Sequence, residues 1–363
     1  MDLERTIKNT IIQKAKPIGF DEFMNLALYY PAKGYYTGGS QKFGEQGDFI
    51  TAPETSDLFG FCLARQSAQI LANEDDILEF GAGSGILAAQ ILFELGRLDK
   101  LPRTYYILEL SAELKQRQKD TINKTLPELI DKVVWLNNLP EHFSGVIIAN
   151  EVLDAMPAKR VINKGGEFFE LGVDCQDDTL VWQTLGVYQN DKMQLPTEVT
   201  QGYTTEVNER AMAWVNSLND FMDKGVVLLI DYGMARDEYF HPQRGDGTLQ
   251  CYYQHKANDN PFEHIGEQDI TTSVNFSDIA DQASASGFVI EGYATQAMFL
   301  ISLGIDEYLL AEKDEKKNAL LAQQVKLLVL PSAMGESFKV LAFSKNTQVK
   351  LDGFKEQDLT CKL

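Results

Sequence analysis

The sequence predicts an α/β fold, built on a mostly parallel sheet of about seven strands with helices on both faces. Three observations support this prediction. Short apolar segments alternate with helical segments through the middle of the chain, as in proteins with parallel sheets. One of these segments leads into a glycine loop that opens a helix. The 363 residues, 44% of them apolar, are also enough to bury a large core.

The chain is predicted to begin with two helices and a long loop. Apolar residues recur at helical spacing from Leu3 to Ile11 and again from Phe23 to Tyr30, and Pro31 ends the second helix. Residues 33–53 are rich in glycine, tyrosine and polar residues, so we expect an irregular segment with a functional role. A surface loop with aromatic anchors is the alternative. A helix is predicted next, from about Asp57 to Ala72.

The predicted strands of the main sheet are short apolar runs. They are residues 77–80, 105–110, 133–136, 145–150, 225–231, 287–293 and 337–345. The long interval between the fourth and fifth strands contains two further strand-like segments, 160–173 and 179–188. The first of these turns at Gly165 and Gly166, so we interpret both as extra antiparallel strands.

Composition excludes several functions. A net charge of -20 argues against nucleic acid as a partner, because phosphate groups are bound by clustered lysine and arginine. This acidity indicates either a solvated surface or attraction to a basic partner. The four cysteines lie far apart without a C-x-x-C pair, and the four histidines show no metal spacing, so free thiols and no metal are expected.

The N-terminal segment predicts a cytoplasmic protein. It carries Asp2 and Glu4 and has no sustained apolar stretch, unlike a secretory signal or an arginine-rich transit peptide. No run in the chain approaches the roughly 18 apolar residues of a membrane span. A processed form in an organelle would have the same features.

The glycine loop follows the strand 77–80 and contains Gly81, Gly83 and Gly85. At a helix N-terminus, such a loop lets a ligand approach the backbone. A dinucleotide fingerprint starting at Gly81 would need glycine at position 86, which is Ile86, so a nicotinamide cofactor is disfavoured. Tight packing between strand and helix is the alternative explanation of the loop.

Two glutamates at strand ends extend this site. Glu79 would repel a pyrophosphate but suits a cationic ligand that carries an amino acid, and S-adenosylmethionine is such a ligand. Glu109, at the end of the next strand, is placed to accept hydrogen bonds from both ribose hydroxyls of a nucleoside.

Catalytic candidates follow the fourth and fifth strands. Asn150, Glu151 and Asp154 lie where open α/β sheets hold their ligands, and Asp231 ends the fifth strand. Carboxylates suit a nitrogen nucleophile, and a guanidinium group could be held by paired acidic groups. Glu151 and Asp154 are therefore the first candidates, although Asp154 could instead cap a short turn.

A series of motifs resembles the MidA-like methyltransferases, a family that includes the mitochondrial complex I assembly factor and many bacterial proteins. The motifs are PAKGYYT, GDFITAPETSDLFG, LEFGAGSG, IIANEVLDAMP, IDYG, GTLQCYYQH, GEQDITTSVNFSDIA, TQAMFLISLGI and MGESFKVL. The resemblance covers almost the whole chain. It implies a Rossmann-like class I methyltransferase sheet with insertions and an N-terminal extension, using S-adenosylmethionine.

The resemblance also implies roles for individual residues. Gly81, Gly83, Gly85, Glu109 and Asn150 would contact the cofactor, with Glu151 at the edge of the active site. Thr51, Pro53 and Glu54 would cover the cofactor as a lid. His255 and Gln296 fall on family motifs, and a structural role is the alternative for His255. Where family members commonly read S-P-E and then F-G-E, this chain has Ala52 and Phe61.

The sequence thus predicts an S-adenosylmethionine-dependent methyltransferase that acts on a protein, with arginine as the favoured acceptor. A respiratory-complex subunit or another arginine-bearing protein would be the substrate. The alternatives are an assembly chaperone that keeps the fold with little turnover, and a nucleotide-dependent oxidoreductase. Residues 1–60 would form the N-terminal helices and cofactor-covering loop, residues 61–155 and 205–363 the methyltransferase domain, and residues 156–204 a strand-rich insertion. The insertion would serve as a homodimer face or a substrate wall.

Overall fold

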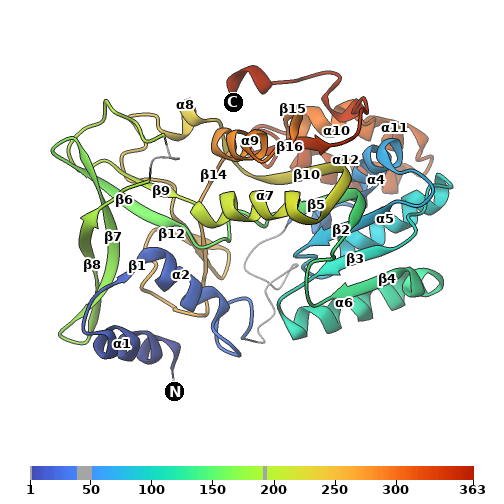
Figure 1. The fold of residues 1–363 in the computed structure, drawn as a ribbon. Coiled ribbons are helices and arrows are strands. Elements are labelled where there is room, and N and C mark those ends of the chain that lie inside the picture. Colours follow the sequence, from blue (N-terminus) through green and yellow to red (C-terminus); the bar gives the residue numbers. More distant parts are fainter. Residues whose placement is uncertain (1, 39–50, 191–193) are drawn as a thin grey trace. The chain divides into compact units, whose positions relative to one another are not determined.

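The computed structural model describes residues 2–38, 51–190 and 194–363, and the chain forms two compact units. The sheet unit comprises Ile50–Val152, Val215–Met234 and Ile279–Leu363, and the hairpin unit comprises Met1–Phe49, Leu153–Trp214 and Ala235–Asp278. Both units are therefore assembled from segments that are far apart in the sequence (Figure 1).

A mixed β-sheet forms the centre of the sheet unit. Its strands follow the spatial order β15, β16, β10, β5, β2, β3 and β4. In that order their bounds are Val289–Thr295, Phe338–Lys345, Met222–Met234, Phe143–Asn150, Asp76–Phe80, Tyr105–Leu108 and Val133–Leu136. Neighbours from β10 to β4 are parallel, whereas β16 is antiparallel to both β10 and β15. The carboxyl ends of β10, β5, β2 and β3 consequently lie at one edge of the sheet.

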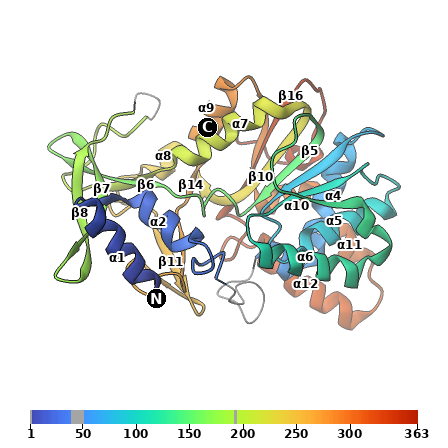
Figure 2. The ribbon, with the colours of Figure 1, turned by 60° about the horizontal axis from the view of Figure 1, so that its bottom comes forward.

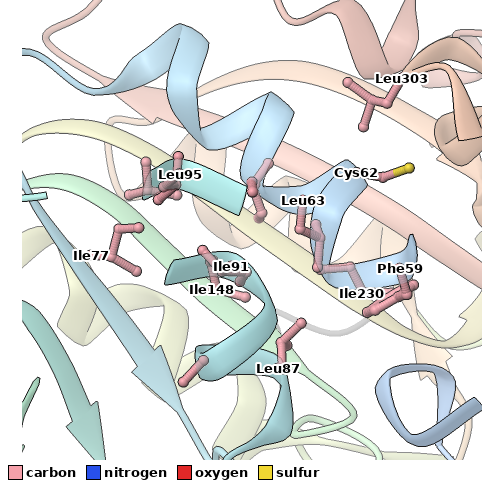
Figure 3. Close-up of a cluster of buried hydrophobic side chains, with 14 of the residues drawn as sticks. Phe59, Cys62, Leu63, Ile77, Leu87, Ile91, Leu95, Ile148, Ile230 and Leu303 are labelled. Carbon is pink, nitrogen blue, oxygen red and sulfur yellow. The ribbon is translucent and has the colours of Figure 1, made fainter. Parts of the chain in front are cut away.

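Helices of the sheet unit pack on this sheet and on one another. They are α3 (Ala52–Thr55), α4 (Asp57–Ile70), α5 (Ile86–Arg97), α6 (Ala112–Thr125), α10 (Gln296–Ser302), α11 (Ile305–Ala311) and α12 (Glu315–Val329), with short 3-10 turns at Pro127–Lys132, Asp352–Phe354 and Thr360–Lys362. Figure 3 shows Leu63 of α4 and Ile91 of α5 against Ile77, Ile148 and Ile230 of three strands. Burial of this shared apolar face holds α4 and α5 against the sheet.

The C-terminal tail runs along β15, the first strand in that order and an edge strand of the sheet. Within β15, the backbone amide of Thr295 donates to the Gln357 side chain at 2.9 Å and that of Tyr293 donates to Asp358 Oδ1 at 3.3 Å. The Leu359 amide in turn donates to the Tyr293 carbonyl at 2.6 Å. The tail therefore satisfies backbone groups along the outer side of β15.

The hairpin unit contains two smaller sheets. One has the order β1, β7, β6 and β9, with β8 paired to β7, and the other has the order β12, β11 and β13. The bounds are β1 (Ile18–Gly19), β6 (Lys159–Lys164), β7 (Glu167–Gln176), β8 (Thr179–Val187), β9 (Thr204–Val207), β11 (Gln250–Tyr253), β12 (Lys256–Asn258) and β13 (Asp269–Thr271). A short strand that belongs to neither of these sheets, β14, spans Val274–Asn275. The helices α1 (Leu3–Lys14) and α2 (Phe20–Tyr29) contact β7 (Figure 2), and α8 spans Arg236–Tyr239. Two helices, α7 (Glu209–Phe221) and α9 (Phe276–Ala285), continue from the hairpin unit into the sheet unit.

Several sequence-based predictions of elements are confirmed. The two N-terminal helices, the helix after Asp57 and the predicted strands all appear near their expected positions. Gly165 and Gly166 adopt φ values of 69° and 92° between β6 and β7, as a two-residue hairpin turn requires. The short helix α3 and the strands β9 and β11 to β13 were not predicted, because their segments are short and lack a clear period.

Of the predicted loop 33–53, residues 39–50 lie outside the described residues. Among the helices that are described, none has the length and apolar content needed to cross a membrane.

Candidate functional site

The glycine loop joins β2 to α5 at the carboxyl edge of the sheet. Gly81, Gly83 and Gly85 all have positive φ values, of 62°, 51° and 83°, which residues with a side chain rarely adopt. A Cβ atom at Gly85 would also lie 2.8 Å from the Cα atom of Gln118 on α6. The loop therefore depends on glycine for its backbone conformation and, at Gly85, for close packing against a neighbouring helix.

Glu109 follows β3, the strand that pairs with β2, and the glycine loop follows β2. Its carboxylate is buried, with Oε1 accepting a hydrogen bond from the Ser111 amide at 2.9 Å and Oε2 accepting one from Gln118 Nε2 at 3.0 Å. Burial raises the pKa of Glu109, while hydrogen bonds from the Ser111 amide, the Gln118 side chain and the Leu110 amide oppose the rise. Since a carboxylate has about four lone-pair sites, Glu109 can still accept a hydrogen bond from a hydroxyl group.

Glu79 lies on β2, beside β3, the strand that Glu109 follows. Its side chain is buried, and the Tyr105 hydroxyl donates to Glu79 Oε2 at 2.9 Å. Burial raises the pKa of Glu79 to about 8, and the nearby charge of Glu109 adds to that rise. A cationic group placed here would favour the ionised carboxylate.

The segment after residue 50 is attached to the glycine loop. Thr51 precedes α3, and its carbonyl accepts the Thr55 amide. The Pro53 carbonyl accepts a hydrogen bond from Gln90 Nε2 of α5 at 2.9 Å, and the Ser84 hydroxyl donates to Glu54 Oε1. The predicted lid residues Thr51, Pro53 and Glu54 are thus held beside the loop and its helix.

The end of β5 forms the adjacent part of the site. Asn150 Nδ2 donates to Glu151 Oε1 at 3.1 Å, and Asn150 Oδ1 is buried without a hydrogen-bond partner among the described residues. Glu151 has a φ of 54°, and its amide donates to the Ile230 carbonyl of β10 at 2.9 Å. A positive φ outside glycine costs conformational energy, and such residues cluster at functional sites.

Asp231 of β10 is fully buried. It directly follows Ile230, which pairs with Asn150 at the end of β5. Its Oδ2 accepts the Val152 amide at 3.2 Å, and its Oδ1 accepts the Tyr232 amide at 2.8 Å. A Cβ atom at Gly81 would lie 3.3 Å from Val152 Cγ2, so the segment after β5 also contacts the glycine loop. The ends of β2, β3, β5 and β10 therefore bring most of the predicted residues together.

Three predicted residues lie outside this group. Gln296 is fully buried in the first turn of α10, where its Nε2 donates to the Leu328 carbonyl of α12 at 2.9 Å. Asp154 belongs to the hairpin unit, where burial raises its pKa to about 6. His255 occupies the tight turn between β11 and β12 of the same unit, with φ at 61° and an exposed side chain.

Sequence reasoning missed Gln118, Tyr105 and Ser84, which donate hydrogen bonds to the predicted glutamates. One signal was available for Gln118. Leu114, Gln118 and Ile122 are the buried residues of α6, spaced four apart, so Gln118 is a polar residue within an apolar stripe. Tyr105 and Ser84 had no such signal, because an aromatic residue in a strand and a serine in a glycine loop are common.

Comparison with known proteins identifies relatives of the whole chain. Residues 62–294 match the model of a family described as "Putative S-adenosyl-L-methionine-dependent methyltransferase". A crystal structure of a Burkholderia thailandensis protein bound to S-adenosyl-homocysteine is 38% identical, has a TM-score of 0.95, and covers 99% of this chain and 96% of its own. The mitochondrial protein arginine methyltransferase NDUFAF7 of Danio rerio is 26% identical over 94% of this chain and 90% of the relative. Its counterpart in Mus musculus is 27% identical over 91% and 82%.

These relatives overturn the predicted location. The proteins from Danio rerio, Drosophila melanogaster and Rattus norvegicus are all named as mitochondrial. The cytoplasmic prediction is therefore wrong. It depended on the lack of an N-terminal targeting pattern, which a processed organelle protein lacks as well.

Proposed function

The chain belongs to a family of S-adenosyl-L-methionine-dependent methyltransferases with an α/β fold, and from this premise we propose that it methylates an arginine side chain of a protein. The observation that carries the proposal is that the glycine loop, with its positive φ values, and the buried carboxylate of Glu109 follow two neighbouring strands of the sheet. The acceptor is proposed from the relatives, which are named as protein arginine methyltransferases. We also propose that the sheet has the strand arrangement of a class I methyltransferase.

The residues of the sheet unit fit this cofactor. Bare backbone at the glycine loop allows close approach at the N-terminus of α5. Glu109 can accept hydroxyl groups of a ribose, Glu79 suits a cationic amino-acid moiety, and the buried Asn150 Oδ1 is a further acceptor. When bound, the cofactor would supply an electrophilic methyl group on a sulfonium. The proposed binding set is Thr51, Pro53, Glu54, Glu79, Gly81, Gly83, Gly85, Glu109, Asn150 and Gln296.

Catalysis by the chain consists of orienting the acceptor, excluding water and receiving a proton. A guanidinium stays protonated at neutral pH, so a carboxylate must bind it and receive the proton that its nitrogen loses. We propose Glu151 for this role, because it lies at the carboxyl edge of the sheet in a strained conformation. Asp154, Asp231 and His255 are the other proposed catalytic residues.

The larger organisation is also part of the proposal. Residues 1–60 would provide the N-terminal helices and the cofactor cover, residues 61–155 and 205–363 the methyltransferase domain, and residues 156–204 an insertion. That insertion contains β6, β7 and β8 and would contact a protein substrate or a second copy of the chain. A respiratory-complex subunit is one proposed substrate, since the mitochondrial relatives belong to the compartment of that complex.

The test combines binding with transfer. Calorimetric titrations with S-adenosylmethionine and with NADH should show micromolar binding of the former alone. Radiolabelled methyl groups should then appear on an arginine-containing peptide but not on its lysine counterpart, and Gly83→Val should abolish both binding and transfer. NADH binding would instead support an oxidoreductase. Cofactor binding without transfer to any arginine-bearing protein would support the assembly-chaperone alternative.

A further inference from the structure

Gln118 connects two parts of the proposed cofactor site. It lies on α6, outside the glycine loop and outside the strands, and its side chain is fully buried. Its Nε2 donates to Glu109 Oε2 at 3.0 Å and to the Gly83 carbonyl at 3.1 Å. A single amide group thus joins the carboxylate after β3 to the backbone of the loop after β2.

A third contact fixes which way this amide points. The indole nitrogen of Trp135, on β4, donates to Gln118 Oε1 at 2.9 Å. An indole can only donate, so the amide oxygen must face Trp135. The amide nitrogen then faces Glu109 and the Gly83 carbonyl, which can only accept. Rotating the amide by 180° would oppose donor to donor at Trp135 and acceptor to acceptor at both other contacts.

The backbone of α6 reinforces the same connection. The Cα atom of Gln118 lies 2.8 Å from the position that a Cβ atom would take at Gly85. Neither the helix nor the loop can shift toward the other, so the loop, the helix and Glu109 form one fixed group.

We infer that Gln118 is a positioning residue for the recognition of the ribose, acting through Glu109 and held in its orientation by Trp135. The inference rests on the proposed function, because it takes the nucleoside of S-adenosylmethionine as the ligand of Glu109. Gln118 holds Oε2 in place and the Ser111 amide holds Oε1. The carboxylate is therefore held in one orientation, as the recognition of ribose hydroxyls requires.

This role predicts coupling between Gln118 and the ribose hydroxyls. A residue that only stabilises α6 would weaken the binding of every ligand by the same factor. A residue that orients Glu109 matters most for ligands whose hydroxyls Glu109 accepts. The two roles are separated by comparing ligands with and without these hydroxyls, as in a double-mutant cycle.

The experiment measures the dissociation constants of S-adenosylhomocysteine and its 2′-deoxy and 3′-deoxy analogues by calorimetry. In the unmodified protein, loss of a hydroxyl should weaken binding about tenfold or more, since it removes a hydrogen bond to a charged group. In Gln118→Met, which keeps the length of the side chain but has no amide, S-adenosylhomocysteine should bind about tenfold more weakly. The penalty for a missing hydroxyl should shrink at least threefold. An undiminished penalty would overturn the inference.

Two further variants control for an unspecific effect on α6 and for misfolding of Gln118→Met. Gln116→Met is the matched control, because Gln116 lies on the same helix but is exposed and donates to Asp120. It should leave all three constants unchanged. Trp135→Phe removes the indole donor while keeping Gln118, so it should reduce the hydroxyl penalty partially if Gln118→Met fails to fold. A penalty equal to that of the unmodified protein in Trp135→Phe would also count against the inference.

The proposed function and this inference fail in different ways. If the unmodified protein binds none of the three ligands, the cofactor assignment itself is wrong. If it binds them and discriminates the hydroxyls, but the discrimination survives in Gln118→Met, only the role of Gln118 is wrong.

Discussion

The carboxylate of Asp231 accepts a hydrogen bond from the backbone amide of Val152, with 3.2 Å between Oδ2 and the amide nitrogen. One residue earlier, the Glu151 amide donates to the Ile230 carbonyl at 2.9 Å. Two successive amides after β5 are therefore held by the end of β10. These contacts stabilise the positive φ of Glu151 at the point where the chain leaves the sheet.

Replacement of Asp231 should disturb Glu151 without removing the cofactor site. Asp231→Asn places an amide group where a carboxylate accepts two backbone amides, so at least one donor faces another donor. We expect a loss of about 1 to 3 kcal/mol in the free energy of unfolding, measured by urea denaturation. The turnover number should fall while the dissociation constant of S-adenosylmethionine stays within about twofold. Equal losses in affinity and turnover would contradict a role of Asp231 in the transfer step.

Glu151 itself should affect transfer rather than binding. Glu151→Gln keeps the side-chain oxygen that accepts from Asn150 but removes the carboxylate that would receive a proton. We expect turnover to fall about 100- to 10,000-fold, as for the loss of a general base, with cofactor affinity unchanged. The measurement is single-turnover transfer of a labelled methyl group, and an unchanged rate would exclude Glu151 from catalysis.

Gly85→Ala should damage the loop through its backbone. An alanine at a φ of 83° costs about 1 to 2 kcal/mol, and its Cβ atom would lie 2.8 Å from the Cα atom of Gln118. Calorimetry should show loss of cofactor binding, and denaturation should show lower stability. Gly96→Ala, within the helix α5 that Gly85 precedes, is the control, because its Cβ atom would meet only Leu101 at 3.9 Å. Similar behaviour of the two variants would refute the packing argument.

Glu109→Gln should weaken cofactor binding roughly 10- to 150-fold, or about 1.5 to 3 kcal/mol, by removing a charged hydrogen-bond acceptor. Glu113→Gln, an exposed change in the first turn of α6, is the matched control. Both affinities are measured by titration at the same pH. Equal affinities in the two variants would place the ribose elsewhere.

Glu79 should give the protein a distinctive pH dependence. The pKa of Glu79 is about 8 in the folded protein, against an ordinary value of 4.5. Between these values the folded state retains a proton that the unfolded state has lost. The contribution of Glu79 to the free energy of unfolding therefore falls as the pH rises, by at most about 1.4 kcal/mol per pH unit. Above pH 8 both states are ionised and this dependence ends.

Urea denaturation between pH 5 and pH 8 checks this expectation. Glu79→Gln should lose less stability than the unmodified protein over that range. Tyr105→Phe removes the hydroxyl that favours the ionised carboxylate, so the decline should extend to higher pH. Parallel pH profiles for Glu79→Gln and the unmodified protein would show that Glu79 titrates normally.

Much of the fold follows from local patterns, whereas its connections do not. The apolar segments that became β2, β3, β4, β5 and β10 were identified because parallel strands are buried on both faces. The antiparallel direction of β16 could not be predicted, since it depends on how the segment from α10 to α12 returns the chain to the sheet. A strand has the same apolar sequence pattern whichever way it runs.

The candidate site shows the same division. Gly81, Gly83, Gly85 and Glu109 were identified from their spacing relative to one strand and the next. Gln118 donates to Gly83, 35 residues away in the sequence, and to Glu109, 9 residues away. Only the packing of α6 brings these groups together. Periodicity marked Gln118 as buried on its helix, but the sequence could not show which acceptors face it.

The C-terminal tail also protects the protein from self-association. An uncovered outer strand is a template on which another chain can add a strand, and such growth leads to aggregates. Here the Tyr293 and Thr295 amides of β15 donate to side chains of the tail, and the Tyr293 carbonyl accepts the Leu359 amide. Shortening the chain before Gln357 would therefore expose this edge and favour self-association, although the proposed cofactor residues would be unchanged.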